Sequence, residues 1–565
     1  MSAPRFVTST DGVRLAVYES GPPSAPALMA IHGYPDDHSL WDGVTAQLEQ
    51  SMRVVRYDVR GAGASDAPET TQSYRIEQLV DDLVTVLDGT VDGQVHLLGH
   101  DWGSTQAWAA LTDARLRGRV AGFTSISGPS LDHAGVWLRA AARHPRAAAA
   151  QAAHSYYTLL FRLPQLPEIA IRAGLLDRGV TGCRDHDSQE HGLALYRANL
   201  FRLSRPQPER IDVPVQVLAP TRDRYVRPPI AFGAPQPWVP DLYAREIAGG
   251  HWIVRGRPDV IAACVREFGT HLFGAPASRE LVRAQRRHGR GEFADTLVIV
   301  TGAAKGIGRA TALEFARAGA DVLIADIDAV GAKQTVNELA ELGATAAWYE
   351  LDVSVADQWT RFVEQVVHEH GVPDIVVNNA GIGIAGPALQ TSKADWERVL
   401  GVNLWGVIHG SRLFGQRMVE RGLGGHIVNI ASAAAYSPSR TLPAYATTKA
   451  AVLMFTDCLR AELADQGIAV TAICPGFVDS NFARTTTFVG LSAREQDAQR
   501  ERAAAAYRRR SYSPERVARQ VIRAVRRRRP VATVTAEAKV LQAISRYAPP
   551  LARRLARIDL AGDRQ

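Results

Sequence analysis

Val95-His-Leu-Leu-Gly-His-Asp-Trp-Gly103 is a short apolar run that ends in a glycine-flanked aspartate, Asp101. The pattern Gly-x-Asp-x-Gly after a strand is typical of a sharp strand-to-helix turn, in which small flanking residues let the central side chain project from the backbone. A five-residue glycine pattern is weak evidence by itself, because a structural turn explains it equally well. The rest of the sequence has to decide whether Asp101 is reactive.

The sequence on both sides of this turn alternates short β-branched runs with helical stretches. Strands are predicted at residues 27–31, 54–57, 95–98, 120–123 and 215–218. Apolar runs that alternate with helices predict a parallel sheet covered by helices on both faces. Between about residues 129 and 212 the strand pattern stops, and alanine-rich helical sequence replaces it. We therefore predict an α/β domain over residues 1–275 with a helical cap inserted at about 129–212.

Two residues downstream of the predicted cap favour a reactive Asp101. Asp223 follows the strand at 215–218, and His251 lies in the loop Gly249-Gly-His-Trp252. A nucleophile, an acid and a histidine in this chain order are typical of a catalytic triad on such a sheet. A carboxylate nucleophile attacks a saturated carbon that bears a leaving group and forms an alkyl ester, which water activated by His251 hydrolyses. Asp223 would orient and stabilise the imidazolium.

Hydrolysis of such an ester needs hydrogen-bond donors for the oxyanion that develops. The motif His32-Gly-Tyr-Pro35 follows the strand at residues 27–31, at the same edge of the sheet as Asp101. We therefore predict that the backbone N–H groups of Tyr34 and Trp102 form the oxyanion hole.

On these motifs, residues 1–275 resemble the epoxide hydrolases of the α/β-hydrolase superfamily. The resemblance implies two cap tyrosines that hydrogen-bond the epoxide oxygen, and phenols suit this task because they stay protonated at neutral pH. We assign these roles to Tyr157 and Tyr196, with Tyr156 as the alternative to Tyr157. The haloalkane dehalogenases share the aspartate nucleophile and the following Trp, but they usually place Asn where this chain has Tyr34. Dehalogenation is therefore the second interpretation.

A second alternation begins after residues 276–292, an arginine-rich stretch that we interpret as a linker. Further strands are predicted at residues 296–300, 322–325, 375–377, 426–429 and 469–473. This alternation predicts a doubly wound parallel sheet of the Rossmann type over residues 293–530.

The first turn of this second sheet carries a glycine-rich loop. Its glycines let the backbone approach a pyrophosphate, whose charge the following helix N-terminus attracts. The predicted contacts are Gly302, Lys305, Gly306, Ile307 and Gly308. Asp326 ends the next strand, where a carboxylate can bind the ribose hydroxyls and repel a 2′-phosphate. We therefore predict NAD as the cofactor, while Lys305 leaves NADP open because a cation there could offset that repulsion.

A second stretch, Gly381-Ile-Gly-Ile-Ala-Gly386, matches the same literal glycine pattern and also follows a strand. Pro387 comes next, however, and no acid stands about 20 residues further on. We interpret this stretch as a loop near the cofactor.

Residues 293 to about 530 resemble the short-chain dehydrogenase/reductase family. The matching motifs are the glycine loop, Asp352-Val353, Asn378-Asn-Ala-Gly381, Asn403, Ser432, Tyr445-Ala-Thr-Thr-Lys449 and Pro475-Gly476. A lone Tyr-x-x-x-Lys pair is common by chance. Its combination with Ser432, thirteen residues earlier, and with the glycine loop makes chance untenable.

Each matching residue has an expected role. Tyr445 exchanges the alcohol proton while the nicotinamide exchanges hydride, and Lys449 together with the nicotinamide charge is expected to lower the pKa of Tyr445 towards neutrality. Ser432 positions the substrate oxygen. By resemblance, Asn403 anchors a water-linked proton relay through Lys449. The other predicted cofactor contacts are Asp352 and Val353 at the adenine, Asn379, Ala380, Gly381, Pro475, Gly476, Val478, and Ser480, which stands where the family usually has Thr.

Positive charge is concentrated near the end of the chain. The net charge is +7 over 565 residues, and residues 501–565 hold 17 Arg and Lys against five Asp and Glu. We predict a basic amphipathic tail over residues 531–565, in which Leu551, Leu555 and Ile558 have helical spacing. Contact with a membrane surface is one interpretation. The favoured interpretation is either a solvated basic face or a helix that completes the dehydrogenase fold. No nucleic-acid motif accompanies the charge, so we predict no nucleic-acid partner.

The four cysteines are far apart in the sequence and form no CxxC pair. This spacing indicates neither a disulfide framework nor a metal site and favours a reducing, cytoplasmic location. The first residues contain no apolar signal region, and no apolar run of about 18 residues occurs. We therefore expect neither secretion nor a membrane span.

The whole layout resembles an actinobacterial family of fusions that includes the mycobacterial epoxide hydrolase D type. The resemblance implies a bifunctional enzyme that acts on apolar, lipid-derived small molecules and assembles into homo-oligomers through the dehydrogenase domain. The competing interpretation is an oxidoreductase whose front domain serves only as a binding or assembly module.

Overall fold

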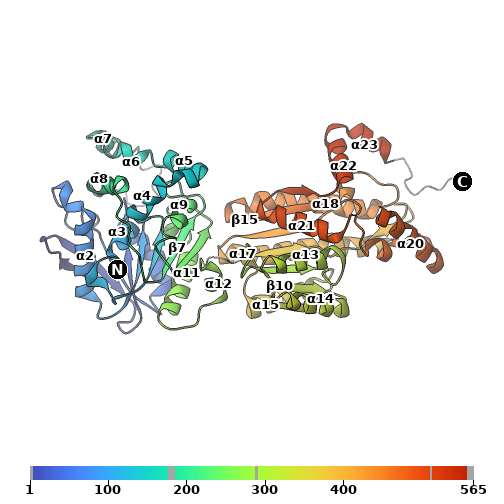
Figure 1. The fold of residues 1–565 in the computed structure, drawn as a ribbon, viewed down its shortest axis with the longest axis horizontal. Helices are drawn as coiled ribbons and strands as arrows, with labels where there is room; N and C mark the ends of the chain where they lie inside the picture. Colours follow the sequence, from blue (N-terminus) through green and yellow to red (C-terminus); the bar gives the residue numbers. More distant parts are fainter. Residues whose placement is uncertain (1–3, 176–184, 287–290, 510–511, 557–565) are drawn as a thin grey trace. The chain divides into compact units, whose positions relative to one another are not determined.

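The computed structural model describes residues 4–175, 185–286, 291–509 and 512–556. The chain divides into two compact units, Met1–Arg287 and His288–Gln565, each with its own sheet (Figure 1). None of the helices in the described ranges combines the length and the apolar character that crossing a bilayer requires.

The first unit is built on an eight-stranded sheet in the order β1-β2-β4-β3-β5-β6-β7-β8. β2 runs antiparallel to both of its neighbours, and the other pairs are parallel. The strands are β1 (Arg5–Thr8), β2 (Arg14–Ser20), β3 (Ala27–Ile31), β4 (Arg53–Tyr57), β5 (Val95–His100), β6 (Val120–Ile126), β7 (Val215–Pro220) and β8 (Leu242–Ile247). Every residue of β3, β5 and β7 is buried, as expected for strands that helices cover on both faces.

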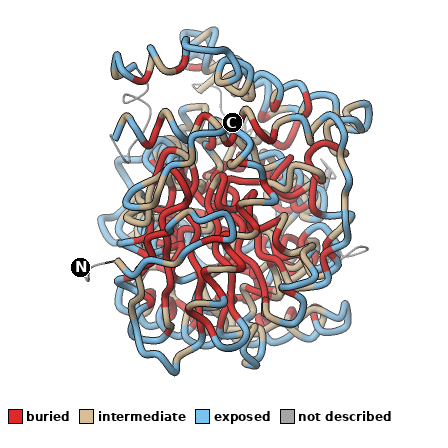
Figure 2. Tube along the Cα trace, turned by 90° about the vertical axis from the view of Figure 1, so that its left-hand side faces the viewer, coloured by how far each residue is buried: buried red, intermediate tan, exposed pale blue. Residues whose placement is uncertain are grey.

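Helices cover this sheet on both sides. They are α1 (Asp42–Leu48), α2 (Ile76–Thr90), α3 (Trp102–Ala110), α9 (Pro228–Gly233), α10 (Ile253–Gly256), α11 (Pro258–Leu272) and α12 (Arg279–Ala284). α2 packs on α3, and α1 packs on α11. Figure 2 shows the buried positions concentrated in the interior of the trace and the exposed positions at its rim.

Between β6 and β7 the described residues form helices and no strand. They are α4 (Leu131–Arg139), α5 (Pro145–His154), α6 (Tyr157–Leu160), α7 (Leu166–Arg172) and α8 (His186–Asn199). This insertion coincides with the segment predicted as a cap, and Figure 1 shows it at one edge of the first unit.

The first unit continues past residue 275, where we predicted its end. Leu281 of α12 is fully buried against Phe268 and Tyr243, and Gln285 forms a β-bridge to Tyr243. The predicted boundary is therefore too early, because apolar side chains after residue 275 complete the packing of the first unit.

The second unit has a seven-stranded sheet in the order β11-β10-β9-β12-β14-β15-β17, and all of its pairs are parallel. The strands are β9 (Leu297–Thr301), β10 (Asp321–Asp326), β11 (Ala346–Glu350), β12 (Ile375–Asn378), β14 (Gly425–Ile430), β15 (Ile468–Cys474) and β17 (Val531–Thr533). A separate pair joins β13 (Ile384–Ala385) to β16 (Thr487–Phe488). The predicted α/β class is confirmed: the second sheet is parallel throughout, and the first is parallel except where β2 pairs with its two neighbours.

The helices of the second unit follow its strands in alternation, as a doubly wound sheet requires. They are α13 (Gly306–Arg317), α14 (Ala329–Glu341), α15 (Ala356–His370), α16 (Lys393–Leu400), α17 (Gly406–Arg421), α18 (Pro443–Leu463), α19 (Phe482–Thr485), α20 (Ala493–Arg509) and α21 (Pro514–Arg526), followed by α22 (Ala536–Tyr547) and α23 (Pro549–Leu555).

The predicted boundary at residue 530 is wrong, because β17 is a strand of the sheet. It pairs with β15 in parallel register from Val531 to Thr533. Thr535 caps α22, and Ala538 of this helix is fully buried. The start of the predicted tail therefore belongs to the dehydrogenase fold, while Ile558, which completed its helical pattern, lies outside the described residues.

Candidate active sites

Asp101 lies at the turn between β5 and α3, with backbone angles φ 50° and ψ −121°. A positive φ is unfavourable for a residue with a Cβ, so the surrounding backbone has to hold the turn in place. Gly103 permits this, since a Cβ there would come 2.3 Å from the carbonyl oxygens of Ile31 and His32. Gly99 is packed equally closely against the backbone of α3. Close backbone contact therefore requires both flanking glycines.

The structure brings the three residues of the predicted triad together. His251 Nδ1 lies 3.1 Å from Oδ2 of Asp223, and His251 Nε2 lies 3.6 Å from Oδ2 of Asp101. Asp223 is held by its own turn, because its Oδ1 accepts the N–H groups of Tyr225 at 2.7 Å and Val226 at 3.1 Å. The imidazole therefore bridges two carboxylates.

These contacts determine the charge of the site. Burial alone would lower the pKa of His251, but the charges of Asp223 and Asp101 and the hydrogen bonds to them raise it to about 10. Burial alone would raise the pKa of Asp223, but the neighbouring His251 outweighs it and lowers that pKa. At neutral pH the imidazole is therefore protonated and paired with both carboxylates.

The loop after β3 faces the Asp101 carboxylate. The Tyr34 N–H donates to Oδ1 of Asp101 at 3.0 Å. Gly33 has no room for a side chain, because a Cβ there would lie 2.6 Å from the backbone N of Trp102. The two N–H groups predicted as the oxyanion hole, of Tyr34 and Trp102, therefore come from backbone segments that touch each other beside Asp101.

Aromatic side chains of the cap surround Asp101. The ring centroid of Tyr196 lies 5.1 Å from that of Trp102 and 6.0 Å from that of Tyr157. Burial raises the pKa of both tyrosines well above its usual value, and the charge of Asp101 raises it further. Tyr156 instead exposes 65% of its surface. The structure thus places Tyr157 and Tyr196 near the carboxylate and Tyr156 in solvent.

Tyr225 is a third tyrosine at this site that the sequence did not indicate. Its ring centroid lies 4.8 Å from that of His251 and 5.0 Å from that of Tyr157. Its only sequence signal was its position two residues after Asp223. The ring fills the space between the imidazole and the cap.

A contact that sequence reasoning also missed joins the loops that carry Tyr34 and His251. Asp36 Oδ2 accepts the indole N–H of Trp252 at 2.9 Å, and Asp36 Oδ1 accepts Arg255 Nη2 at 2.9 Å. The Asp36 side chain is fully buried. Asp36 therefore ties the predicted oxyanion loop to the loop of the predicted base. Its position directly after the His-Gly-Tyr-Pro motif was the available signal.

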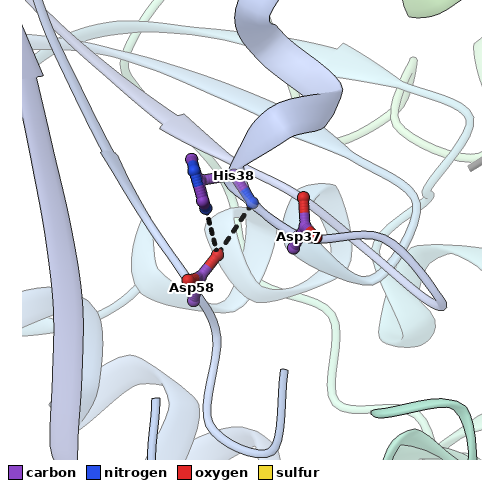
Figure 3. Close-up of side chains that lie close together, drawn as sticks. All are labelled: Asp37, His38 and Asp58. Carbon is purple, nitrogen blue, oxygen red and sulfur yellow. Dashed lines mark hydrogen bonds and ion pairs between the residues drawn. The ribbon is translucent and has the colours of Figure 1, made fainter. Parts of the chain in front are cut away.

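Asp37, His38 and Asp58 form a nearby cluster whose ligand-type atoms lie within 4.8 Å of one another (Figure 3). Both oxygens of Asp58 already accept hydrogen bonds: Oδ1 from the His38 N–H at 2.8 Å, and Oδ2 from the Ala64 N–H at 3.0 Å and the Tyr18 hydroxyl at 3.2 Å. Asp37 caps the following turn through the N–H of Ser39. These hydrogen bonds account for the cluster, which holds the loop after β3 in place.

In the second unit the glycine-rich loop lies between β9 and α13. Gly302 and Gly306 have φ values of 65° and 61°, which favour glycine. A Cβ at Gly308 would lie 2.2 Å from the carbonyl oxygen of Gly302. A Cβ at Gly306 would meet nothing nearer than Ser480, 3.6 Å away. The loop is therefore tightly folded on itself and open beside Gly306, and it fits a pyrophosphate at the start of α13.

Two acidic residues and one lysine lie where the ribose of the cofactor is predicted to bind. Asp326 ends β10, and its Oδ2 accepts the N–H of Ala304 at 2.8 Å. Lys305 Nζ donates to Oδ2 of Asp328 at 2.6 Å. Lys305, the residue that left NADP open, is therefore paired with a carboxylate. Sequence reasoning missed Asp328, although it stands only two residues after Asp326.

The other predicted cofactor residues lie in the loops that follow the strands. The Asn379 side chain donates to the carbonyl oxygens of Thr301 and Gly302 at 2.9 and 3.0 Å, which fixes the glycine loop. Asp352 accepts the N–H of Ser354 at 2.9 Å, and Val353 is buried. The other members of the set are Ile307, at the start of α13, Ala380 and Gly381, after β12, and Pro475, Gly476 and Val478, after β15.

Tyr445 and Lys449 of the predicted second catalytic group lie in the first turns of α18. Lys449 Nζ lies 5.8 Å from the centroid of the Tyr445 ring and donates to the carbonyl oxygen of Ile430 at 2.8 Å. The Ser432 side chain hydrogen-bonds Tyr445. Asn403 is fully buried in a single π-helical turn, Gly401–Trp405. Such turns occur often at functional sites because they displace one side chain from the regular helical position.

Gly381 leaves space between Asn403 and Lys449. A Cβ at this glycine would lie 3.4 Å from Asn403 Oδ1 and 3.5 Å from Lys449 Nζ. The first glycine of the second literal glycine pattern thus belongs to this site. The following residues, Ile384–Ala385, pair with Thr487–Phe488.

Burial controls the charge of this second group. It lowers the pKa of Lys449 to about 8 and raises the pKa of Tyr445 above its usual value, although the hydrogen bond with Ser432 opposes the latter shift. The expected lowering of the Tyr445 pKa is therefore not produced by Lys449 in the protein alone. In the protein alone, the burial of the phenol outweighs the interactions that oppose it.

Residues of the predicted tail hold one loop of this site. A Cβ at Gly476 would lie 2.2 Å from Thr535 Oγ1. Glu537 Oε1 accepts the N–H of Phe477 at 3.1 Å. The start of α22 therefore positions the loop after β15.

Comparisons with known proteins agree with the division of the chain into two units. The family model described as alpha/beta hydrolase fold matches residues 26–255, and the model described as short chain dehydrogenase matches residues 296–487. A Mycobacterium tuberculosis protein, "Probable oxidoreductase EphD", is 44% identical, over 98% of this chain and 98% of its own.

Two solved structures each align with one part of the chain. A short-chain dehydrogenase/reductase from Burkholderia phymatum in complex with NAD is 28% identical, with a TM-score of 0.42, over 45% of this chain and 93% of its own. An epoxide hydrolase of the α/β-hydrolase superfamily, from metagenomes of hot environments, is 23% identical, with a TM-score of 0.42, over 48% of this chain and 99% of its own.

The fold and the matches define an enzyme in which an α/β-hydrolase unit is followed by a short-chain dehydrogenase unit. The chain belongs to the family of the mycobacterial EphD proteins, as the predicted resemblance indicated. Its dehydrogenase unit takes a nicotinamide cofactor, and its substrates are small molecules.

Proposed function

We propose that the chain is a bifunctional enzyme that hydrolyses epoxides at Asp101 and interconverts alcohols and ketones at Tyr445. The observation that carries the first activity is the placement of His251 between Asp101 and Asp223, with Tyr157 and Tyr196 near the nucleophile. The second activity is carried by Ser432, Tyr445 and Lys449 in a short-chain dehydrogenase unit.

Epoxide opening begins with attack of an Asp101 carboxylate oxygen on one epoxide carbon. The C–O bond to the epoxide oxygen breaks, and that oxygen takes a proton from Tyr157 or Tyr196. Both phenols hold this proton at neutral pH because burial raises their pKa. The products of this step are an alkyl ester on Asp101 and a tyrosinate.

The charge of His251 links this step to the next. The imidazole starts protonated, because two carboxylates raise its pKa to about 10. Ester formation removes the charge of Asp101, so the pKa of His251 falls. The imidazolium then returns a proton to the tyrosinate and becomes a neutral base. His251 is thus converted into a base only after the ester has formed.

Hydrolysis of the ester restores the starting state. Neutral His251 takes a proton from water, whose oxygen attacks the ester carbonyl of Asp101. The N–H groups of Tyr34 and Trp102 stabilise the oxyanion. Collapse of this intermediate breaks the ester bond, the diol oxygen takes the carboxyl proton, and Asp101 is again a carboxylate beside a protonated His251.

Tyr34 favours epoxides over haloalkanes as substrates. A leaving halide needs a donor that binds it, and at position 34 a phenol stands where the dehalogenases usually have an amide. An epoxide oxygen instead needs a proton, which Tyr157 and Tyr196 can supply.

In the dehydrogenase unit, Tyr445 transfers the proton of the substrate hydroxyl and Ser432 holds the substrate oxygen. The nicotinamide cofactor, when bound, accepts or donates the hydride. Lys449 provides positive charge near Tyr445, and Asn403 supports a proton path to Lys449.

We propose NAD rather than NADP as the cofactor. Asp326 and Asp328 place two carboxylates at the ribose position, and Asp328 neutralises the cation of Lys305. The negative charge that remains repels a 2′-phosphate.

A screen of epoxides, haloalkanes and secondary alcohols tests this assignment with the wild-type protein, Asp101→Asn and Tyr445→Phe. We expect Asp101→Asn to abolish diol formation only and Tyr445→Phe to abolish NADH formation only. Halide release without diol formation would identify a dehalogenase. Absence of any hydrolysis in the wild-type protein would favour the interpretation of the front unit as a binding module.

A further inference from the structure

The cap carries a concentration of exposed apolar side chains. Between residues 156 and 175 seven large hydrophobic residues each expose at least 44% of their surface. They are Tyr156, Leu159, Leu160, Leu163, Leu166, Ile169 and Leu175. We call this set the cap patch. Single exposed leucines need no explanation, whereas a concentration of large exposed apolar side chains is typical of an interaction surface.

The same short segment also lines the hydrolase site. The Phe161 ring lies 5.8 Å from that of Tyr34 and 5.0 Å from that of Tyr196. Tyr157 lies beside Tyr196 as well. α6 therefore has apolar residues on both sides, with Tyr157 and the adjoining Phe161 towards Asp101 and the cap patch towards solvent. The segment formed by α6 and Phe161 therefore lies between the interior of the site and the cap patch.

Unpaired positive charge accompanies the cap patch. Residues 139–175 contain five arginines and one glutamate. The glutamate, Glu168, is paired with Arg197 at 2.8 Å. Arg143, Arg146 and Arg162 are exposed and form no ion pair with an acid in the part of the chain that the structure describes. Figure 1 shows α5, α6 and α7, which carry or adjoin these residues, along the outer edge of the first unit.

We propose that the cap patch docks on an anionic lipid surface and that apolar substrates enter the hydrolase site from there. Leucines that insert into the headgroup boundary, together with arginines that remain at the phosphates, are the pattern of interfacial binding. Tyr156 suits the same depth, because its ring is apolar and its hydroxyl is polar. The unpaired arginines favour anionic lipid over a second copy of this chain, since a second cap would bring the same positive charge into the contact. Entry of substrate rests on the proposed epoxide hydrolysis, whereas docking does not.

Cosedimentation of the full-length protein with vesicles tests docking without any catalysis. The vesicles are phosphatidylcholine alone, or phosphatidylcholine mixed with phosphatidylglycerol. The test variant is Leu159→Ser/Ile169→Ser, and the matched control is Leu342→Ser/Leu389→Ser, which changes two exposed leucines of the dehydrogenase unit. We expect the wild-type protein and the control to bind the anionic vesicles. The test variant should bind them more weakly, by about tenfold or by a larger factor.

A charge variant, Arg143→Gln/Arg162→Gln, measures the electrostatic contribution to vesicle binding separately. It should weaken binding to the anionic vesicles by about tenfold and leave binding to phosphatidylcholine unchanged. Because all four substituted side chains are exposed, the variants should keep the wild-type Tm and dehydrogenase activity. A test variant that lost its Tm would be replaced by the single variants Leu159→Ser and Ile169→Ser.

Three results would overturn the proposal. The wild-type protein could fail to bind either kind of vesicle. The test variant could bind as tightly as the control, which would transfer any membrane contact to another surface such as the predicted tail. Alternatively, light scattering could show that the test variant has a smaller oligomer than the wild-type protein, which would identify a second copy as the occupant of the cap patch.

Discussion

The two candidate active sites of this chain hold their buried basic side chains in opposite ways. In the hydrolase unit a buried histidine is paired with two carboxylates, and these charges raise the pKa of His251 to about 10. In the dehydrogenase unit no acid pairs with the buried lysine among the described residues, and burial lowers the pKa of Lys449 to about 8. At neutral pH His251 therefore keeps its second ring proton, whereas Lys449 is close to losing its extra proton.

This difference shows what each site needs from its ligands. His251 already has its partners within the chain, and in the proposed reaction ester formation changes its pKa by removing the charge of Asp101. Tyr445 remains a neutral phenol in the protein alone, because burial raises its pKa. The charges that set the protonation of His251 therefore belong to the chain itself, whereas we expect the Tyr445 phenolate to need the positive charge of the bound nicotinamide as well.

The largest expected effect tests the phenols of the hydrolase site. The variant Tyr157→Phe/Tyr196→Phe removes both proton donors, so the rate of ester formation should fall by about 1000-fold. Rapid-quench measurement of the Asp101 ester gives this rate. Tyr156→Phe is the matched control and should keep the wild-type rate, because Tyr156 faces solvent. Equal loss in the control would refute the assignment of the two phenols.

The next effect tests the charge of Lys449. Lys449→Met should reduce alcohol oxidation by about 100-fold near neutral pH, where we expect the wild-type ammonium and the charge of the bound nicotinamide to support the Tyr445 phenolate together. The ammonium loses its proton as the pH rises through about 8. The ratio of the wild-type rate to the variant rate should therefore fall above that pH. Lys393→Met, at an exposed lysine, is the control, and a ratio that does not change with pH would contradict this role.

A smaller effect tests Asp36 as a positioning residue of the hydrolase site. Asp36→Asn leaves Arg255 without its charged partner and loosens the link to the His251 loop. Hydrolysis of the ester should slow by about tenfold, while ester formation should change little, because Asp101 itself is not moved. Asp37→Asn is the control. Equal slowing of both steps would indicate a general loss of structure instead.

The smallest effect tests cofactor choice in the dehydrogenase unit. Asp328→Asn frees the Lys305 cation to meet a 2′-phosphate. The ratio of kcat/KM for NADP to that for NAD should rise by about fivefold, since an exposed charge contact contributes about 1 kcal/mol. Asp357→Asn, at an exposed acid of α15, should leave the ratio unchanged. An unchanged ratio in Asp328→Asn would remove Lys305 from the argument for NAD.

Much of both folds could be predicted from the sequence, because strand periodicity and glycine turns are local signals. The turn at Asp101 and the glycine loop at Gly302 each needed only a few adjacent residues to be recognised. The short strand β17 was missed because three residues carry no clear periodicity. Its place in the sheet depends on pairing with β15, which lies more than 50 residues earlier.

The contacts that connect motifs could not be predicted in this way. Asp36 meets Trp252 across 216 residues, and no local pattern signals such a pair. The burial of the Tyr445 phenol could not be predicted for a similar reason. The Tyr-x-x-x-Lys spacing predicts that the two side chains are neighbours, but the structure adds the burial of the phenol and the distance of Lys449 from it.

Intact-mass spectrometry of His251→Gln after addition of an apolar epoxide tests the central claim most directly. The variant lacks the base for ester hydrolysis, so the ester should accumulate. We predict a mass increase equal to one epoxide molecule, located by peptide mapping on Asp101. The absence of an adduct with an epoxide that the wild-type protein hydrolyses, or an adduct on another residue, would contradict covalent catalysis by Asp101.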